Sequence, residues 1–459
     1  MIKTLKALLF MLAAAAGTGA HAAATAADAG HTHYSEWLVA SEMKRTPHPY
    51  NLDFSSSPRW SYVMGIELES MLDTYLEYGG DGIADYLKEY PAKMIDSKGN
   101  ITKYKYSDFN LDNVRTGRFI LRMYNLFPAA KDSLALCTLF KQLENQPRTQ
   151  EGVWWHKAIY ANQVWLDGIF MGLPFYCMAA PWLRPDNVMH YYDDAADQIT
   201  KTEARTYDEP TELWKHAWDE THSMFWADKT TGLSQHTWAR ALGWFSMAMV
   251  EVLDVLPEDY ARRADIEEML RKVMRSVVRY QDDASGVWYD VMDVDDPRNY
   301  LEATASSMFT YCLLKGHRLG YLDDSFLEAG IKGYRGIVKE FIKKNSDGTI
   351  SLTKCCEVSG LGPDNNRRRD GSFEYYISEP VRDNDAKGVG PFVWASLEME
   401  RMGFTVQNLY THDTGITPAA EQRRSSGRVY DLRGISRGTA TGGLTISGGR
   451  KTIRKQVLK

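Results

Sequence analysis

The chain has 459 residues and a formal net charge of −6, and its shares of 44% hydrophobic and 25% charged residues are typical of an ordinary globular protein. The acidic balance excludes a broad basic surface of the kind that binds nucleic acid, and the length allows one large domain or two to three smaller ones. Aromatic residues make up 12% of the chain. They suit stacking on sugar rings, although a large core uses them too.

The first 22 residues predict a secretory signal peptide. Lys3 and Lys6 precede an apolar run from Ala7 to Ala16, and the small residues at Ala20-His21-Ala22 supply a cleavage site. The run is too short to span a membrane, and no later apolar run reaches about 18 uninterrupted residues, so we expect no transmembrane segment. The prediction is an exported protein, located in the periplasm, at the cell surface or outside the cell.

The body of the chain predicts one helix after another. Apolar residues recur at three- and four-residue spacing in twelve segments, separated by connectors rich in Gly, Pro and Asp. We therefore expect an all-α domain over residues 34–403, with six inner and six outer helices closed into a ring, and a two-lobed helical protein is the alternative. The segments are Trp60–Tyr78, Gly82–Ile95, Phe109–Leu126, Leu134–Leu143, Asn162–Met178, Val188–Ala204, Thr211–Phe225, Trp238–Leu256, Arg262–Gln281, Leu301–Leu319, Ser325–Lys344 and Gly388–Arg401.

The C-terminal part has a different character. Residues 404–426 are polar and predict a linker, and residues 427–459 alternate apolar positions between glycines, which predicts a short β-rich tail. From Phe404 to Lys459 there are ten Lys or Arg against three Asp or Glu, so the tail is basic and the body acidic. The segment 430–434 (Tyr-Asp-Leu-Arg-Gly), with the strand-like 443–446 and the Gly-Arg-Lys at 449–451, resembles the sorting domain of type IX secretion cargo, from which Thr445 departs. That resemblance implies export machinery as a partner, and an irregular basic tail that binds an anionic surface is the alternative.

Five cysteines are scattered along the chain without metal-ligand spacing. Cys137, Cys177 and Cys312 lie in apolar helical segments, where we expect buried thiols, whereas the adjacent Cys355 and Cys356 are candidates for exposure. Export permits a disulfide but the spacing demands none. No motif calls for a metal or a cofactor, and we expect neither.

Asp167 is the most informative single residue. It lies between Trp165 and Phe170 in an apolar, aromatic segment, where an ionised carboxylate is costly unless it is paired. Such a carboxyl often has a raised pKa and can hold a proton near neutral pH, as a general acid must. For an isolated Asp, capping of a helix N-terminus is the simpler interpretation.

Other candidate site residues are individually ambiguous. Asp112 precedes a predicted helix, so N-capping is its simplest role. His156 and Lys157 come shortly before Asp167, and a Lys near a carboxylate forms a salt bridge or binds an acid group of a substrate. His216 is expected at the start of a helical turn, where a surface or capping His is the common case.

Trp238 and Arg240 are two residues apart near a predicted helix start. This spacing can present one ring for stacking and one guanidinium for a carboxylate. An aromatic core stripe with a surface Arg explains it equally well.

Taken together, these segments resemble glycoside hydrolase family 105, the unsaturated rhamnogalacturonyl hydrolases of pectin breakdown. The family fold, an (α/α)6 barrel, agrees with the separate prediction of about twelve helices. The similarity covers roughly Pro58 to Gly403, and the Trp-Leu-Asp-Gly and Lys-Gly-Val-Gly-Pro-Phe segments are its most specific parts. The matching segments are 110–118, 156–174, 216–219, 238–244, 375–380 and 384–392.

The resemblance implies an unusual hydrolysis. Pectin lyases leave a terminal uronic acid with a C4=C5 double bond, and the family protonates C4 and adds water at C5, so that the sugar ring opens and the aglycone leaves. By resemblance Asp167 is the acid and base, and Asp112 orients the substrate or keeps Asp167 protonated by like-charge repulsion. His216, Trp238 and Arg240 would hold the unsaturated uronate, with His156 and Lys157 near its carboxylate or hydroxyls.

Two alternatives remain open at this point. A related hydrolase of unsaturated glycosaminoglycan or ulvan fragments needs the same acid with a different site for the leaving sugar. A non-catalytic sugar-binding (α/α) barrel on the cell surface needs neither carboxylate, and this chain keeps both.

Overall fold

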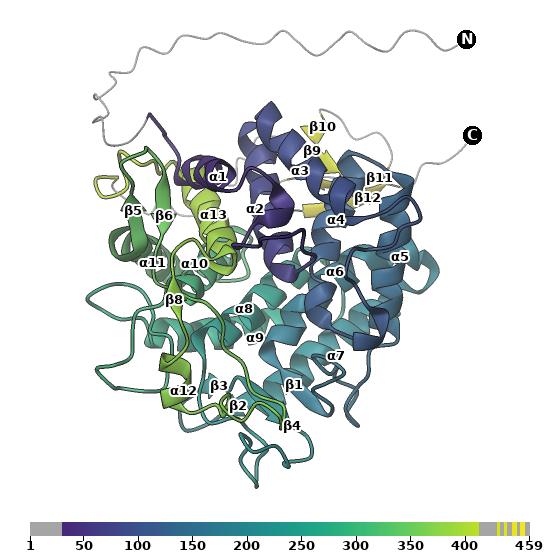
Figure 1. Cartoon of the computed structure of the whole chain (residues 1–459), viewed down its shortest axis with the longest axis vertical. Coiled ribbons are helices and arrows are strands. Elements are labelled where there is room, and N and C mark those ends of the chain that lie inside the picture. Colours follow the sequence, from purple (N-terminus) through teal and green to yellow (C-terminus); the bar gives the residue numbers. More distant parts are fainter. Residues whose placement is uncertain (1–29, 413–428, 432–435, 438–442, 448–449, 455–459) are drawn as a thin grey trace.

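The computed structural model of the chain describes residues 30–412 and, in the tail, 429–431, 436–437, 443–447 and 450–454. The predicted signal peptide and most of the predicted linker lie outside these residues. The helices account for most of the described chain (Figure 1). The twelve long ones are α1 (Tyr34–Arg45), α2 (Tyr62–Tyr78), α3 (Asp81–Met94), α4 (Thr116–Leu126), α5 (Ala130–Glu144), α6 (Leu166–Leu183), α7 (Val188–Thr206), α8 (Ala239–Leu253), α9 (Arg263–Arg279), α10 (Ala303–Arg318), α11 (Ser325–Phe341) and α13 (Ala386–Arg401), and a short one is α12 (Phe373–Ile377).

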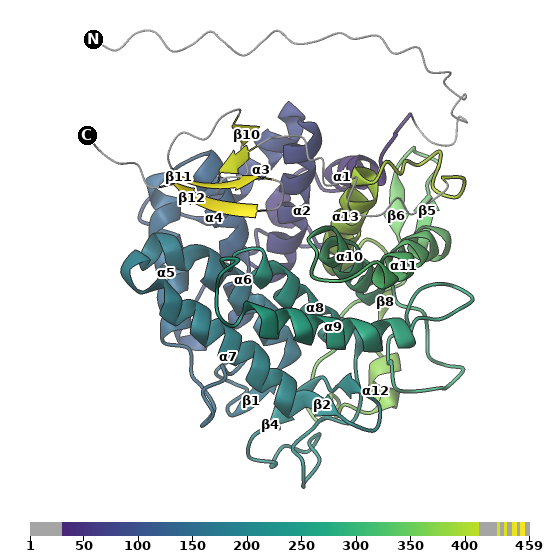
Figure 2. The same cartoon turned by 180° about the vertical axis from the view of Figure 1, so that it is seen from behind.

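Six of the helices form an inner ring. In order around the ring, α2, α4, α6, α8, α10 and α13 each pack on the next, and α13 closes the ring on α2. The other six long helices lie outside them, so that α9 covers α8 and α11 covers α10 (Figure 2). The predicted all-α (α/α)6 barrel is confirmed.

Glycines allow neighbouring inner helices to approach closely. A Cβ on Gly65 of α2 would lie 2.7 Å from the Cα of Thr116 on α4, and a Cβ on Gly390 of α13 would lie 2.6 Å from Ile66 on α2. Neither glycine has a positive φ. Their role is to save space between helices, not to free the backbone.

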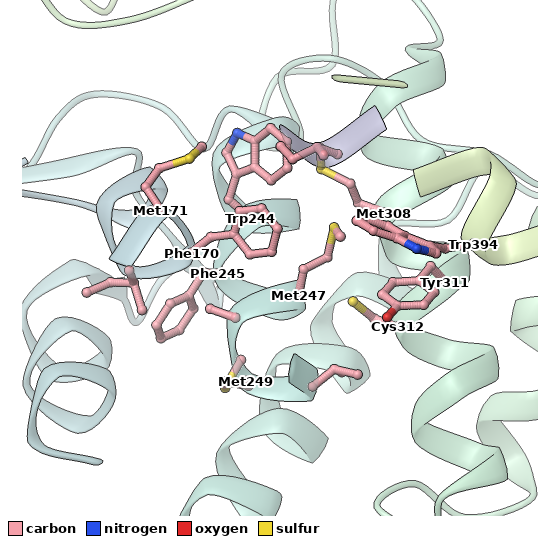
Figure 3. Packing of buried hydrophobic residues seen from close by; sticks show 14 of the residues in the cluster. Phe170, Met171, Trp244, Phe245, Met247, Met249, Met308, Tyr311, Cys312 and Trp394 are labelled. Carbon is pink, nitrogen blue, oxygen red and sulfur yellow. The ribbon is translucent and has the colours of Figure 1, made fainter. Parts of the chain in front are cut away.

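The inside of the ring is a packed core. Phe170 of α6 and Trp244 of α8 stack with 4.8 Å between ring centroids (Figure 3). The fully buried Arg115 lies over the Phe170 ring at 4.5 Å and pairs with Glu69 of α2 at 2.8 Å. A buried charge is costly unless it is compensated, and this pairing supplies the compensation. The ends of the barrel, not its interior, therefore present the functional groups.

Eleven of the twelve predicted helices are present. The helix predicted over 211–225 is wrong, because this segment contains short strands. Strand β3 (Leu213–Trp214) pairs with β2 (Tyr207–Asp208), and β4 (Ala217–Asp219) pairs with β1 (Gln163–Trp165). The buried residues of these short strands recur along the sequence at a spacing close to that of a buried helical face. Helix α1 was not predicted, because its buried face includes Ser35, Ser41 and Glu42, which hide the apolar pattern.

Two further strand pairs come from the part of the chain between α11 and α13. Strand β5 (Ile342–Lys344) pairs with β6 (Ile350–Leu352), and β7 (Cys355–Cys356) pairs with β8 (Val381–Arg382). In the tail, the described strands form one sheet in the order β10-β9-β11-β12, as expected for a short β unit. Their bounds are β9 (Val429–Asp431), β10 (Ser436–Arg437), β11 (Gly443–Ser447) and β12 (Arg450–Arg454).

The cysteines differ from expectation in two ways. Cys137 is exposed, although its segment is helical, because it faces outward from α5. Cys355 and Cys356, which we expected could be exposed, are both buried in the strand pair with β8. All five lie in the described residues, and none of them forms a disulfide bond.

Of the described helices, α6 has the length and composition to cross a membrane. In the barrel, however, 72% of that window is buried. This is the signature of a core helix, and it accords with the position of α6 in the inner ring.

Candidate active site

The predicted site residues gather at the end of the barrel where the inner helices begin. Asp167 is in the first turn of α6, Arg240 is in that of α8, and Asp112 is in the 3-10 helix η4 (Leu111–Asn113) before α4. His216 lies between β3 and β4, not on a helical turn as expected. The N-terminal end of a helix carries partial positive charge, so several inner helices favour an anion at this end.

Asp112 binds the two basic residues that precede Asp167 in sequence. Its Oδ2 lies 2.6 Å from Nζ of Lys157, and its Oδ1 lies 3.3 Å from Nε2 of His156. Burial raises the pKa of Asp112, but Lys157 and His156 lower it more, so the pKa is well below its usual value. Asp112 is therefore a carboxylate, and three separately predicted residues form one cluster.

Asp167 faces His216 across the site. Its Oδ2 lies 3.3 Å from Nε2 of His216, which is fully buried, while the Asp167 side chain is 14% exposed. Burial raises the pKa of Asp167, and so does Asp112, but His216 and His156 outweigh them, so the pKa lies below its usual value. The expected raised pKa is wrong, because the sequence reveals the apolar neighbours of Asp167 but not the histidine opposite it.

The indole of Trp165 joins the two carboxylate clusters. It stacks on His156, with 5.3 Å between centroids and 12° between planes, and it meets His216 edge-on at 5.3 Å. Trp165 is itself almost fully buried. One rigid aromatic spacer thus fixes the position of Asp112 relative to Asp167.

Trp238 and Arg240 lie deeper than the sequence suggested. Both are 1% exposed, and the Arg240 guanidinium lies over the Trp238 ring at 4.4 Å. Arg240 donates to the backbone carbonyls of Cys356 and Glu357. Burial lowers its pKa, but the nearby ionisable groups, Cys356 and Asp385 first among them, raise it above its usual value, so Arg240 remains charged. In this structure Arg240 binds the backbone of residues 356–357 beside the site, and its contact with a uronate stays a prediction.

Comparison with known proteins agrees with this geometry. A glycoside hydrolase from family 105 of C. acetobutylicum ATCC 824 has a similar structure, with a TM-score of 0.76 and 37% identity over 80% of this chain and 99% of that chain. Residues 34–403 match the family model described as Glycosyl Hydrolase Family 88. The chain belongs to glycosyl hydrolase family 88/105.

Two curated relatives extend the comparison. Protein Atu3128 of Agrobacterium fabrum (strain C58) is 36% identical over 234 residues, which cover 50% of this chain and 97% of the relative. The unsaturated rhamnogalacturonyl hydrolase YesR of Bacillus subtilis (strain 168) is 25% identical over 289 residues, covering 60% of this chain and 74% of YesR. This family 88/105 chain is accordingly a glycoside hydrolase of the unsaturated rhamnogalacturonyl and glucuronyl hydrolase type.

The structure of this family 88/105 hydrolase adds residues that were not among the predicted site residues. The hydroxyl of the buried Tyr376 on α12 lies 2.8 Å from Nδ1 of His216. Asp290 accepts a hydrogen bond from Nε1 of Trp238, and burial beside Glu302 raises the pKa of Asp290 to about 8. Tyr376 belongs to a segment that matched the family in sequence, which was the available signal, whereas Asp290 lies on an irregular connector with no motif around it.

Tyr376 supports one tautomer of His216 in this hydrolase. Burial raises the pKa of the Tyr376 phenol well above its usual value, so the hydroxyl keeps its proton and can donate a hydrogen bond to Nδ1 of His216, 2.8 Å away. The Asp167 carboxylate can only accept, so it favours an N–H of His216 at Nε2, which faces it, and leaves Nδ1 to accept from Tyr376. Tyr376 is thus a positioning residue that acts on Asp167 through His216.

We expect Tyr376→Phe to raise the pKa of Asp167, because His216 no longer has its Nε2 proton fixed toward that carboxylate. An acid must be protonated to act, so kcat/KM is high below its pKa and falls above it. The basic limb of the kcat/KM profile should therefore move to higher pH. A profile that keeps its position, with only a lower thermal midpoint, would show that Tyr376 is merely structural.

Proposed function

We propose that this hydrolase removes the terminal 4,5-unsaturated galacturonosyl residue from the products of rhamnogalacturonan lyases by hydrating the C4=C5 bond. The observation that carries the proposal is the pair of carboxylates, each with its own histidine, at the end of the barrel where the inner helices begin. The likeness to YesR, whose name states a rhamnogalacturonyl substrate, supports the choice of sugar.

The terminal residue of such a substrate is an anion, and the site suits an anion. The N-terminal ends of α6 and α8 bring partial positive charge to the site. Lys157 is 22% exposed and is paired with Asp112. We assign Lys157 and His156 to the uronate carboxylate or its neighbouring hydroxyls, with Asp112 fixing both side chains in place.

Asp167 performs the proton transfers. It gives a proton to C4, a water molecule adds its hydroxide part to C5, and the carboxylate takes back the remaining proton of that water. The resulting hemiketal opens the ring between C5 and the ring oxygen, and the hemiacetal left at C1 expels the aglycone as an alcohol. One carboxyl therefore serves as acid and then as base, and no nucleophile attacks C1.

The low pKa of free Asp167 must rise when substrate binds. The substrate carboxylate is a like charge, and substrate displaces water from a side chain that is 14% exposed in the free enzyme. Both changes disfavour the ionised carboxyl and favour proton uptake. The proposal therefore links substrate binding to protonation of Asp167.

The decisive assay follows the absorbance of the conjugated double bond on matched unsaturated disaccharides. We expect the absorbance to fall fastest with a galacturonosyl-rhamnose substrate, and more slowly with disaccharides derived from glycosaminoglycans or from ulvan. A faster loss with either of the latter would move the substrate assignment to that class. No loss with any member would leave the sugar-binding barrel as the better account.

We also propose that the reaction takes place after export. The support is the predicted signal peptide in residues 1–22 and the resemblance of residues 427–459 to a sorting domain.

A further inference from the structure

Phe54 combines backbone strain with exposure. Asp53 and Phe54 have φ values of 55° and 57°, so two consecutive non-glycine residues adopt the left-handed conformation. That conformation costs roughly 1–2 kcal/mol per residue. The Phe54 side chain gains no burial in return, since it is 65% exposed. Strain of this kind persists where the surrounding structure enforces it, often at ligand-binding positions.

Ion pairs enforce this conformation. The Asp53 side chain is 5% exposed, and its Oδ1 lies 2.6 Å from Arg382. Lys387 and Arg59 lie further from the Asp53 carboxylate, at 3.9 and 3.7 Å. Because Asp53 is anchored in this conformation, the side chain of Phe54 projects into solvent.

Arg382 also orients the Phe54 ring. Its guanidinium lies 4.8 Å from the ring centroid, and it is held in place by Asp385 at 2.6 Å. The three carboxylates around Arg382, the third being Glu357 at 3.4 Å, compensate its charge. With Arg382 against one face and an exposure of 65%, the ring is a fixed apolar surface open on its other face.

A chain of contacts connects this surface to the active site. Arg382 pairs with Glu357, whose backbone carbonyl accepts from Arg240. Phe54 is therefore connected to Arg240 of the site through Arg382 and Glu357.

We propose that Phe54 is a stacking platform for a sugar ring of the leaving oligosaccharide, beyond the unsaturated residue. Sugar rings present C–H faces that pack on exposed aromatic rings, and a ring fixed in advance binds without losing rotamer freedom. The proposal rests on the proposed function in one respect, that the substrate is an oligosaccharide with an aglycone.

The test measures binding by calorimetry in the Asp167→Asn background, in which turnover is expected to be much slower than in the native enzyme. The ligands are an unsaturated galacturonosyl-rhamnose disaccharide, the corresponding tetrasaccharide, and the methyl glycoside of the unsaturated uronate, which has no aglycone ring. Phe54→Asn removes the ring with a residue that tolerates the left-handed region, and Phe54→Tyr keeps the ring.

We expect Phe54→Asn to weaken binding of at least one oligosaccharide about 3- to 10-fold, while the methyl glycoside is unaffected and Phe54→Tyr binds like the parent. The Asn variant should also melt at a higher temperature, because strain is relieved. Unchanged affinity for both oligosaccharides would overturn the proposal. So would a dimer-to-monomer change of Phe54→Asn in sedimentation, because the ring would then be an interface.

The two proposals fail separately. If the native enzyme leaves every unsaturated substrate intact while Phe54→Asn still weakens oligosaccharide binding, the proposed reaction is wrong and the platform stands. If the native enzyme consumes the double bond and the Phe54 variants all bind alike, the reaction stands and the platform is wrong.

Discussion

Replacing Asp167 by Asn is expected to lower kcat on an unsaturated disaccharide by between about 10²- and 10⁴-fold, the contribution typical of a positioned acid and base. Asn has the same shape and can still contact His216, 3.3 Å away from the present carboxylate oxygen, but it can neither give nor take the proton. The thermal midpoint should change little, because the side chain is partly exposed and its removal leaves no ion pair essential to the core.

A matched control lies nearby. Asp108 is 51% exposed and pairs only loosely with Lys105, at 3.4 Å, so Asp108→Asn makes the same chemical change outside the site. Its kcat should stay within about two-fold of the native enzyme, since exposed ion pairs contribute little. Near-native turnover in Asp167→Asn would remove Asp167 from the chemistry.

The pH dependence of the native enzyme follows from the same residue. The pKa of Asp167 lies below its usual value in the free enzyme. Because kcat/KM reports the free enzyme, it should already be falling as pH rises through the acidic range, whereas kcat, which reports the complex, should hold to higher pH. Identical limbs for both parameters would argue against proton uptake on binding.

Replacing Arg240 by Ala is expected to reduce the free energy of unfolding by about 3–5 kcal/mol, the cost of removing one partner from a buried charge cluster. The guanidinium is 1% exposed, binds two backbone carbonyls and lies among buried anions that include Asp385 and Glu302. Removing it leaves those groups without compensation and opens a cavity beneath Trp238. Urea unfolding followed by tryptophan fluorescence measures the change.

Arg298→Ala is the control for this loss. Arg298 also lies over an aromatic ring, that of Phe373 at 5.2 Å, but its side chain is 54% exposed. Its removal should leave the urea midpoint almost unchanged, because exposed ion pairs contribute little to stability. An unchanged urea midpoint in Arg240→Ala, together with a large rise in KM, would show instead that Arg240 contacts the uronate directly.

Helical periodicity was sufficient to predict the barrel, because most helices have a continuous apolar face that appears as a regular apolar repeat in the sequence. It failed where burial depends on partners distant in sequence. Leu213–Trp214 and Ala217–Asp219 are buried by pairing with segments 207–208 and 163–165, and no local pattern distinguishes such short strands from a helical turn.

The sequence identified most of the residues of the site, but it did not predict how they are arranged in space. Asp112 contacts both His156 and Lys157, a grouping that the sequence did not predict. Asp112 does raise the pKa of Asp167, as the resemblance implied, but the net shift of that pKa is downward. The pKa direction of Asp167 was not accessible, because it depends on His216, which lies on a separate connector. The depth of Arg240 likewise depends on the carbonyls of Cys356 and Glu357, more than a hundred residues away.

The central claim is that water adds at C5 and not at C1. Turnover of an unsaturated disaccharide in H₂¹⁸O, quenched with borohydride so that the carbonyl oxygens are fixed as alcohols, locates the incorporated oxygen by mass spectrometry. Hydration of the double bond predicts the label on C5, with the unlabelled ring oxygen on C1. Label on C1 would mean direct attack at the glycosidic carbon and would contradict the account.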